Sequence, residues 1–306
     1  MNISFQNLTE IKGGLSKKKI FRKYEKKISK IVIDFSNDEN ELNNFLNVYE
    51  ILKRLNISIP NIYEVHLNKK IILIEDFGNN TFDKIFKKDE VYDLLKLAVD
   101  NLIIIQNSLI EKDLTKLKKY SYSDLRKEIS EFVDYYIPYK KISNFSSNKF
   151  YKSWEHIYNC QNFDYGNFIH KDFEFINLIL LDKNSLHLKC GIIDFQSAFI
   201  GFKGWDLFTI LENPRINFTR KYNEDLIKYF YENITINNDF VEFRNQYYLL
   251  NLSRQSRLLG RWVKLYKNGK KEYLKYVNIT TKRIQSSIDN LPSSNLKTIY
   301  ENIFVN

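Results

Sequence analysis

The chain has 306 residues, 43% of them hydrophobic and 27% charged, a composition that is ordinary for a folded globular protein and excludes general disorder. Its formal net charge is +10, but short basic runs are spread along the chain beside acids, so we expect a small-molecule partner and neither nucleic acid nor a membrane surface. With two cysteines, no leader pattern and no apolar run of ~18–20 residues, the sequence predicts a reduced, cytoplasmic protein without a zinc site.

Residues 1–74 are predicted to form a small β-rich lobe with one helix. From Asp38 onward, apolar residues recur mostly at three- and four-residue intervals, which predicts a helix that ends before Pro60. Short apolar runs on either side of this helix are typical of strands. These strands are expected at 20–24, 31–35, 62–67 and 70–74.

A polar connector at 75–80 is predicted to act as a hinge between this lobe and a larger one at 81–306. The larger lobe is mainly helical in pattern, for example at 91–110. One part of it is extended instead, because apolar runs at 168–169, 178–181 and 187–195 surround several polar residues. Short strands that end at acids can mount a catalytic or metal site on rigid backbone. The order of elements therefore predicts an α+β fold with two lobes.

The polar residues between these runs are those that a phosphoryl-transfer site requires. Asp172 and Asn177 lie five residues apart in a predicted turn, and Asp194 ends a predicted strand. Phosphoryl transfer from ATP needs Mg²⁺ held against the phosphates and an acceptor hydroxyl oriented in line. Mg²⁺ prefers oxygen ligands, so Asp194 and Asn177 could supply them while Asp172 accepts or orients the hydroxyl proton. These residue types are therefore compatible with ATP- and Mg²⁺-dependent phosphoryl transfer.

His170-Lys171-Asp172 with Asn177, followed by Ile193-Asp194-Phe195, resembles the H-x-D-x-x-x-x-N and D-F-G signatures of kinases. The variant resembles the aminoglycoside phosphotransferase and choline kinase superfamily, which implies the two-lobed protein-kinase-like fold. Residues 191–215, GIIDFQSAFIGFKGWDLFTILENPR, are similar to the corresponding stretch of bacterial kinases that phosphorylate N-acetylmuramate or N-acetylglucosamine at the anomeric hydroxyl. Further resemblance to that group lies at 21–24, 74–78 and 254–274.

The resemblance implies a role for each matching residue. Asp172 would be the catalytic base, and Asn177 and Asp194 would be the Mg²⁺ ligands. Backbone groups of Glu75 and Phe77 in the connector would hydrogen-bond the adenine of ATP. Gly13 and Gly14 would lie in the loop that covers the phosphates.

One departure concerns the lysine that kinases usually carry on the third strand, where it pairs the phosphates with a helix glutamate. The matching strand here has Asp34 and no lysine within 31–34. The sugar-kinase subgroup is similar in lacking this lysine. We expect Arg22, Lys23 or Lys30 to supply the positive charge, with Arg22 assigned to ATP and Glu50 as the helix partner.

Several other residues could have either a structural or a functional role. Asp172 and Asn177 are also common turn residues when taken singly, but their order with His170 and Asp194 favours catalysis. His170 is predicted to hold the loop as a structural residue. Asp206 fits either a helix cap or a brace for the catalytic loop. Arg215 is a candidate substrate contact, whereas Arg254, Arg257 and Arg261 fit either an acidic substrate group or a solvated helix face.

Three functions remain open from the sequence. The first is an anomeric sugar kinase, favoured by the Gln196 that follows the Asp194-Phe195 pair. The second is an aminoglycoside, choline or homoserine kinase. The third is a nucleotide-binding pseudokinase, which the missing strand lysine would explain. The oligomeric state and the hydroxyl that accepts the phosphate are not indicated by these patterns.

Overall fold

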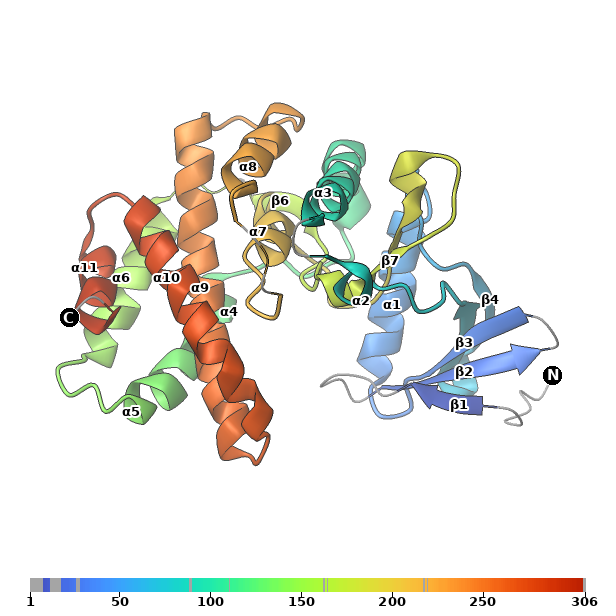
Figure 1. Ribbon diagram of the computed structural model, residues 1–306, viewed down its shortest axis with the longest axis horizontal. Coiled ribbons are helices and arrows are strands. Elements are labelled where there is room, and N and C mark those ends of the chain that lie inside the picture. The colour runs from blue at the N-terminus through green and yellow to red at the C-terminus, as the bar shows by residue number, and fades with distance from the viewer. Residues whose placement is uncertain are drawn as a thin grey trace.

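The computed structural model describes residues 8–11, 18–25, 28–87, 90–109, 111–161, 163, 165–216, 218 and 220–304. The predicted phosphate loop at Gly13 and Gly14 lies outside these residues. Figure 1 shows a β-sheet with helix α1 at one end of the molecule and a group of long helices at the other.

The N-terminal part of the structure is an antiparallel sheet of five strands in the order β1-β2-β3-β5-β4. Alternate residues face opposite sides of a strand, so Ile72 and Ile74 join the core beneath α1, whereas Ile71 and Leu73 pack on the other face with Val32. The strands are β1 (Leu8–Ile11), β2 (Lys19–Glu25), β3 (Ile28–Asp34), β4 (Ile62–His66) and β5 (Ile71–Glu75).

Helix α1 (Glu39–Leu52) lies between β3 and β4 in the chain. Its N-cap is Asp38, whose side chain accepts a hydrogen bond of 3.2 Å from the backbone N–H of Glu41. The apolar side of the helix, which includes Leu42, Phe45 and Val48, is buried in the main core.

The larger part of the chain is mainly helical, as its sequence pattern predicts. Helices α9 and α10 pack along one another, and Figure 1 shows both as long rods beside α4 and α7. The helices are α2 (Phe82–Ile85), α3 (Val91–Ser108), α4 (Tyr122–Glu131), α5 (Ile137–Tyr139), α6 (Ser147–Cys160), α7 (Trp205–Leu211), α8 (Asn223–Glu232), α9 (Phe240–Lys267), α10 (Val277–Asn290) and α11 (Asn295–Phe304). Among the described residues, no helix has both the length and the apolar character needed to cross a membrane.

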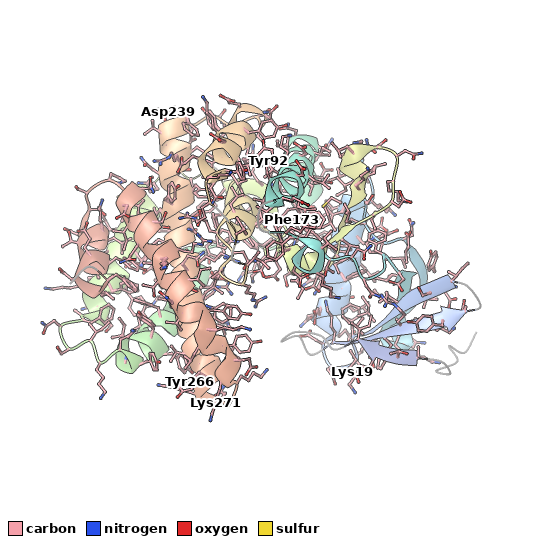
Figure 2. The ribbon with its side chains drawn as sticks, in the orientation of Figure 1. Lys19, Tyr92, Phe173, Asp239, Tyr266 and Lys271 are labelled. Atoms are coloured by element: carbon pink, nitrogen blue, oxygen red, sulfur yellow. The ribbon has the colours of Figure 1, made fainter. Side chains whose placement is uncertain are left out.

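Two small antiparallel sheets interrupt the helices. Strand β6 (Tyr165–Ile169) pairs with β9 (Phe199–Phe202), and β7 (Leu178–Leu180) pairs with β8 (Cys190–Ile192). Phe173, from the loop after β6, is fully buried near the middle of the molecule, between the sheet that carries Lys19 and the long helix that begins after Asp239 (Figure 2). The two small sheets therefore lie where the N-terminal sheet meets the helices.

The extended run expected at 187–195 is only partly correct. Leu186–Lys189 forms a short 3₁₀ turn, and the strand is limited to β8. The carbonyl of His187 accepts from Asn101 Nδ2 at 3.1 Å, and that of Leu188 accepts from Ser58 Oγ at 2.7 Å. Because side chains from other elements take up these carbonyls, the turn needs no neighbouring strand.

Candidate active site

The loop that follows β6 carries Asp172 and contains several hydrogen bonds between its own residues. The backbone carbonyl of Asp172 accepts from the N–H of Glu174 and from Asn177 Nδ2, both at 2.8 Å. The N–H of Asn177 donates to the carbonyl of Glu174, also at 2.8 Å. Lys171, just before Asp172, has a φ of 78°, in the left-handed region that is costly for a residue with a side chain. The loop conformation is therefore imposed by its surroundings.

Asp206 provides that constraint from helix α7. Its Oδ2 accepts from the backbone N–H of His170 at 2.7 Å, and its Oδ1 accepts from that of Lys171 at 2.9 Å. The N-cap of α7 is Gly204, so the Asp206 carboxylate braces the catalytic loop rather than capping its helix. Burial raises the pKa of Asp206 to about 7, against the lowering effect of these two N–H groups.

His170 is fully buried and joins this loop to the segment that carries Asp194. Its Nε2 lies 3.1 Å from the carbonyl oxygen of Ile193, so Nε2 carries the proton and donates. Its Nδ1 has no hydrogen-bond partner among the described residues. Burial lowers the pKa of His170 to about 4, which keeps the ring neutral near neutral pH.

Asp194 follows β8 and also has a left-handed backbone, with φ of 64°. The N–H of Ile193 donates to the carbonyl of Asn177 at 3.1 Å, so the two loops are tied together directly. Burial alone would raise the pKa of Asp194, but Lys18 and Gln196 hold it below its ordinary value. Gln196 Nε2 donates to Asp194 Oδ1 at 3.0 Å. Asp194 is therefore an ionised carboxylate presented on a constrained turn.

Lys18 contacts the candidate site and was not identified by the sequence interpretation. It lies immediately before β2, donates to Asp194 Oδ1, and has its Nζ 3.7 Å from Glu41 Oε1 on α1. Gln196 Nε2 also donates to Glu41 Oε1, at 3.0 Å. The Lys18 side chain is only 5% exposed. The structure thus joins Lys18, Glu41 and Asp194 in one cluster.

The residues expected to supply the positive charge and the helix glutamate do not lie in this cluster. Lys23 and Lys30 pair with Glu25, at 2.6 and 2.9 Å. Glu50 pairs with Lys53 on the exposed side of α1, at 2.6 Å. Glu41 is in the first turn of α1, whereas Glu50 is more than two turns further along. The basic run at 17–19, directly before a predicted strand, was the signal that could have indicated Lys18.

Arg22 fastens the sheet to the connector. Its Nε and Nη2 donate to the two oxygens of Asp76 at 2.5 and 2.9 Å, and its Nη1 donates to Asn79 Oδ1 at 2.8 Å. In the same segment, Glu75 Oε2 accepts from Asn61 Nδ2 at 2.6 Å. A bidentate arginine–carboxylate pair fixes direction as well as distance. Arg22 therefore orders the segment whose backbone was expected to contact adenine.

Phe77 packs against the strand that leads to Asp194. A Cβ added to Gly191 in β8 would lie 2.7 Å from the Phe77 ring, closer than real Cβ contacts allow. Gly191 also forms a bridge with Ser58. The connector and strand β8, which leads to Asp194, are thus in contact at a position where only glycine fits.

A group of charged residues lies on another side of Asp172. Glu174 Oε1 accepts from Arg254 Nη2 at 2.7 Å, and Glu174 Oε2 accepts from Arg215 Nη1 at 3.2 Å. The sequence interpretation did not identify Glu174. The side chain of Arg215 is 36% exposed. Burial, together with the charges of Glu174 and Asp194, raises the pKa of Asp172.

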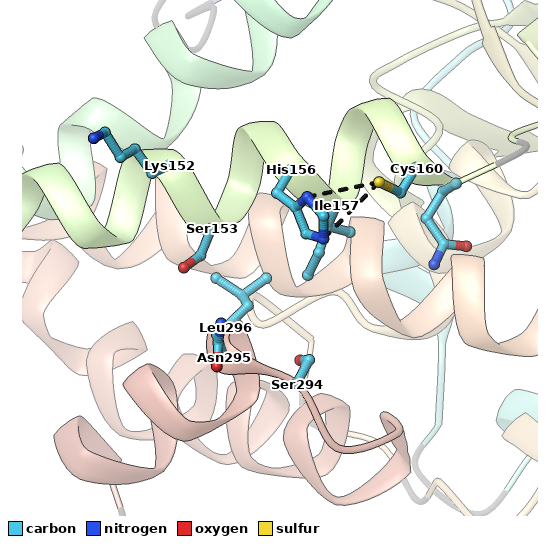
Figure 3. Close-up of a pocket in the computed structure, with 9 residues that line it drawn as sticks. Lys152, Ser153, His156, Ile157, Cys160, Ser294, Asn295 and Leu296 are labelled. Atoms are coloured by element: carbon cyan, nitrogen blue, oxygen red, sulfur yellow. Dashed lines mark hydrogen bonds between the residues drawn. The ribbon is translucent and has the colours of Figure 1, made fainter.

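A separate pocket of about 450 Å³ lies far from these residues in the fold, between α6 and the start of α11 (Figure 3). His156 and Cys160 point toward each other there, with Nδ1 and Sγ 3.6 Å apart. The pocket contains none of the predicted catalytic residues. Within the described ranges, no group of three or more His, Cys, Asp and Glu side chains could hold a metal ion.

No protein-family model matches the chain. In sequence, it is 22% identical over 258 residues to the N-acetylmuramate/N-acetylglucosamine kinase of Pseudomonas aeruginosa, covering 80% of this chain and 73% of that protein. It is also 22% identical over 262 residues to the kinase of the same name from Neisseria meningitidis serogroup B, covering 80% of this chain and 74% of that protein.

Solved structures of similar fold cover almost the whole chain. Aminoglycoside phosphotransferase APH(4)-Ia has a TM-score of 0.62 at 11% identity, over 94% of this chain and 95% of that one. Choline kinase LicA from Streptococcus pneumoniae has a TM-score of 0.58 at 13% identity, over 93% and 94%. Spectinomycin phosphotransferase APH(9)-Ia, solved with ADP and spectinomycin, has a TM-score of 0.55 at 17% identity, over 97% and 93%.

These likenesses confirm the α+β, protein-kinase-like fold. With the sequence relatives, which are named as kinases, they show that the chain is a kinase whose fold is similar to that of aminoglycoside phosphotransferases and choline kinases. Within that class, its sequence is similar to N-acetylmuramate/N-acetylglucosamine kinases, as the motif at 191–215 predicted.

Proposed function

We propose that this kinase transfers the γ-phosphoryl group of ATP to the anomeric hydroxyl of an N-acetylated amino sugar, of the N-acetylmuramate or N-acetylglucosamine type. The observation that carries the proposal is a chain of hydrogen bonds around Asp172, Asn177 and Asp194: Asn177 Nδ2 donates to the carbonyl of Asp172, the N–H of Ile193 donates to the carbonyl of Asn177, and Lys18 donates to Asp194. The sequence relatives named for these two sugars support the choice of acceptor.

Asn177 and Asp194 have the chemistry of a Mg²⁺ site. Asn177 uses its amide nitrogen to hold the loop, so its side-chain oxygen is the atom left for a cation. Asp194 has its pKa below the ordinary value and offers a carboxylate. Mg²⁺ favours such oxygen ligands and, when bound, would neutralise charge on the transferring phosphate. We therefore assign Asn177 and Asp194 as its ligands.

Asp172 is the proposed base. Its raised pKa makes the carboxylate a better proton acceptor than an exposed aspartate, and a base is most effective when its pKa approaches the working pH. The hydrogen bonds to its backbone carbonyl hold the residue in place before the acceptor arrives. In this proposal, Asp172 orients the anomeric hydroxyl and takes its proton as the new P–O bond forms.

The connector and Lys18 supply the proposed contacts with ATP. Backbone groups of Glu75 and Phe77 would hydrogen-bond adenine, in a segment that Arg22 orders through Asp76. Lys18 would meet the phosphates while Glu41 steadies it, which is the part that a third-strand lysine plays in other kinases. This pairing argues against a pseudokinase, because a buried lysine and a helix glutamate are both present at the metal segment.

The acceptor side of the site is basic. Arg215 and Arg254 both contact Glu174, and Arg257 lies near Asp172. Aminoglycosides and choline are cations, for which an acidic surface or an aromatic cage is the usual recognition chemistry. The arginines therefore favour a neutral or acidic sugar over these two acceptor classes.

A coupled ADP-release assay with Mg-ATP tests the proposal, with sugars, amino sugars, aminoglycosides and choline as acceptors. We expect turnover on an N-acetylated hexosamine, and a loss of about 10²–10⁴-fold in kcat in Asp172→Asn, because the variant lacks a base. Asp182→Asn is the matched control, since Asp182 is an exposed acid after β7. Turnover on choline or an aminoglycoside alone would contradict the proposed acceptor, and full activity in Asp172→Asn would contradict the proposed base.

A further inference from the structure

Helix α9 carries two arginines, Arg254 and Arg257, near Asp172, the proposed base that the acceptor must reach. Arg254 and Arg257 are three residues apart and therefore share a face of the helix. Arg261, one turn further on, donates to Glu131 at 2.6 Å and so belongs to the contact with α4. Of the three arginines noted in the sequence, Arg254 and Arg257 therefore lie near Asp172, whereas Arg261 joins two helices.

Arg254 and Arg257 each have a buried N–H group without an acceptor among the described residues. Arg254 is only 2% exposed; its Nη2 donates to Glu174, but its Nη1 has no hydrogen-bond partner among the described residues. Arg257 Nε is also buried and has no hydrogen-bond partner there, since Glu128 Oε2 lies 4.0 Å away. Native proteins satisfy nearly all buried donors, and a charged donor is the most costly to leave unpaired.

These donors lie beside the reacting centre. Arg257 is close enough to Asp172 for its charge to act on that carboxylate, and Arg254 interacts with the charges of both Asp172 and Arg257. Arg215, whose guanidinium lies 5.5 Å from the centre of the Trp262 ring, brings a third and partly exposed cation to Glu174. One carboxylate, Glu174, is thus shared by two arginines.

We propose that Arg254 and Arg257 form a subsite for a carboxylate carried by the acceptor sugar, with Arg215 at its exposed edge. The inference rests on the proposed sugar-kinase function and narrows it to an acidic sugar as the preferred substrate. A carboxylate has two oxygens that accept charge-assisted hydrogen bonds from guanidinium N–H groups, so it could accept from Arg254 Nη1 and from Arg257 Nε. A solvated helix face would not account for these groups, because both are buried.

N-acetylmuramate and N-acetylglucosamine are suitable probes, because the first carries a carboxylate that the second lacks. The experiment measures kcat/KM for each sugar in the wild type, Arg257→Gln, Arg257→Lys and Arg261→Gln. We expect the wild type to prefer the acidic sugar. In Arg257→Gln, kcat/KM should fall about 10- to 100-fold for the acidic sugar and much less for the neutral one, as for loss of a charged hydrogen bond.

The two control variants separate recognition from folding. Arg257→Lys keeps the charge and should retain part of the preference, whereas Arg261→Gln should leave the ratio between the two sugars unchanged because Arg261 is satisfied by Glu131. A parallel fall for both sugars in Arg257→Gln would overturn the subsite and assign Arg257 a structural role. An equal use of both sugars by the wild type would overturn it as well.

Calorimetric titration of the two sugars into the wild type and Arg257→Gln gives a second readout that needs no turnover. Tighter binding of N-acetylmuramate that is lost in Arg257→Gln supports the subsite. Equal binding of the two sugars, or no binding of either, overturns it. If N-acetylmuramate binds in this way but neither sugar is phosphorylated, the proposed reaction fails and the carboxylate subsite stands.

Discussion

At the scale of single residues, the catalytic loop is held by groups that take no part in the proposed chemistry. Asp206 accepts two backbone N–H groups from His170 and Lys171, and His170 donates to the carbonyl of Ile193. These contacts offset the left-handed backbone at Lys171 and Asp194. The sequence suggested His170 as structural and left Asp206 open between two roles. Only the contacts with the loop decide that Asp206 acts as a brace.

His170 should make the stability of the protein depend on pH. Its pKa is lowered from 6.5 to about 4 by burial, so the unfolded chain binds a proton that the folded chain excludes. The contribution of neutral His170 to the free energy of unfolding is present above about pH 6.5 and is lost as the pH falls toward 4. We expect the free energy of unfolding to fall by about 2 kcal/mol when the pH is lowered from about 7 to about 5.

Urea unfolding curves at the two pH values measure this effect, with His170→Asn as the comparison. The variant cannot take up the proton, so its loss of stability over the same interval should be smaller by roughly the same amount. An equal loss in the wild type and the variant would show that other groups cause the pH dependence.

At the scale of elements, helix α9 connects the proposed acceptor site to the rest of the helical part. Along its length it packs against α4, α7, α8 and α10. Most of its residues are buried, including polar ones such as Gln255 and Asn251, which hydrogen-bond each other at 2.9 Å. A helix buried on nearly every side shows little amphipathic pattern, so its sequence alone does not tell which neighbours surround it.

Gly260 marks the closest approach of α9 to another element. A Cβ at this position would lie 2.1 Å from the backbone carbonyl carbon of Glu131. Backbone cannot move aside as a flexible side chain can, so we expect Gly260→Ala to destabilise the protein by about 1–3 kcal/mol or more, despite the higher helix propensity of alanine. The free energy of unfolding in urea measures the change.

Gly166→Ala in β6 is the matched control for this substitution. A Cβ at Gly166 would meet no atom within 4 Å, so its effect should be small. If Gly260→Ala were as stable as the wild type, the helices would have to separate at this contact without cost, contrary to the close packing expected of a protein interior.

At the scale of the whole molecule, the candidate active site is assembled from two parts of the chain that are far apart in sequence. Lys18 and Asp194 are 176 residues apart, and Glu41 and Gln196 are 155 residues apart. Phe45 of α1 stacks on Phe195, with ring centroids 4.8 Å apart, beside these polar contacts. The N-terminal sheet and helix therefore contact residues 194–196 through both polar and apolar groups.

Lys18→Ala tests whether this contact serves catalysis. If Lys18 meets the phosphates of ATP, the variant should lose on the order of 10²-fold in kcat/KM for ATP, the usual cost of removing one charge-stabilising donor. Lys19→Ala is the control, since Lys19 is exposed and carries the same charge at the next position. Equal activity of the two variants would show that Lys18 only joins the parts of the molecule.

The sequence by itself determined the features that depend on neighbours in the chain. Apolar residues at helix and strand spacing placed α1, α3, β2 and β5 close to their observed bounds, because burial of one face imposes that spacing. The order of Asp172, Asn177 and Asp194 likewise indicated a kinase, since all three lie on loops next to short apolar strands. The 3₁₀ turn at Leu186–Lys189 was missed because its carbonyls bond to distant side chains.

Only the tertiary structure decided which distant groups complete the site. Lys18 with Glu41, and Glu174 with Arg254, come from elements that meet only when the sheet, α1 and α9 pack around the same loops. Local spacing cannot encode these pairs, because a lysine or an arginine on a surface helix and one at an active site have the same near neighbours in sequence. Their roles follow from burial and from the partner that packing provides.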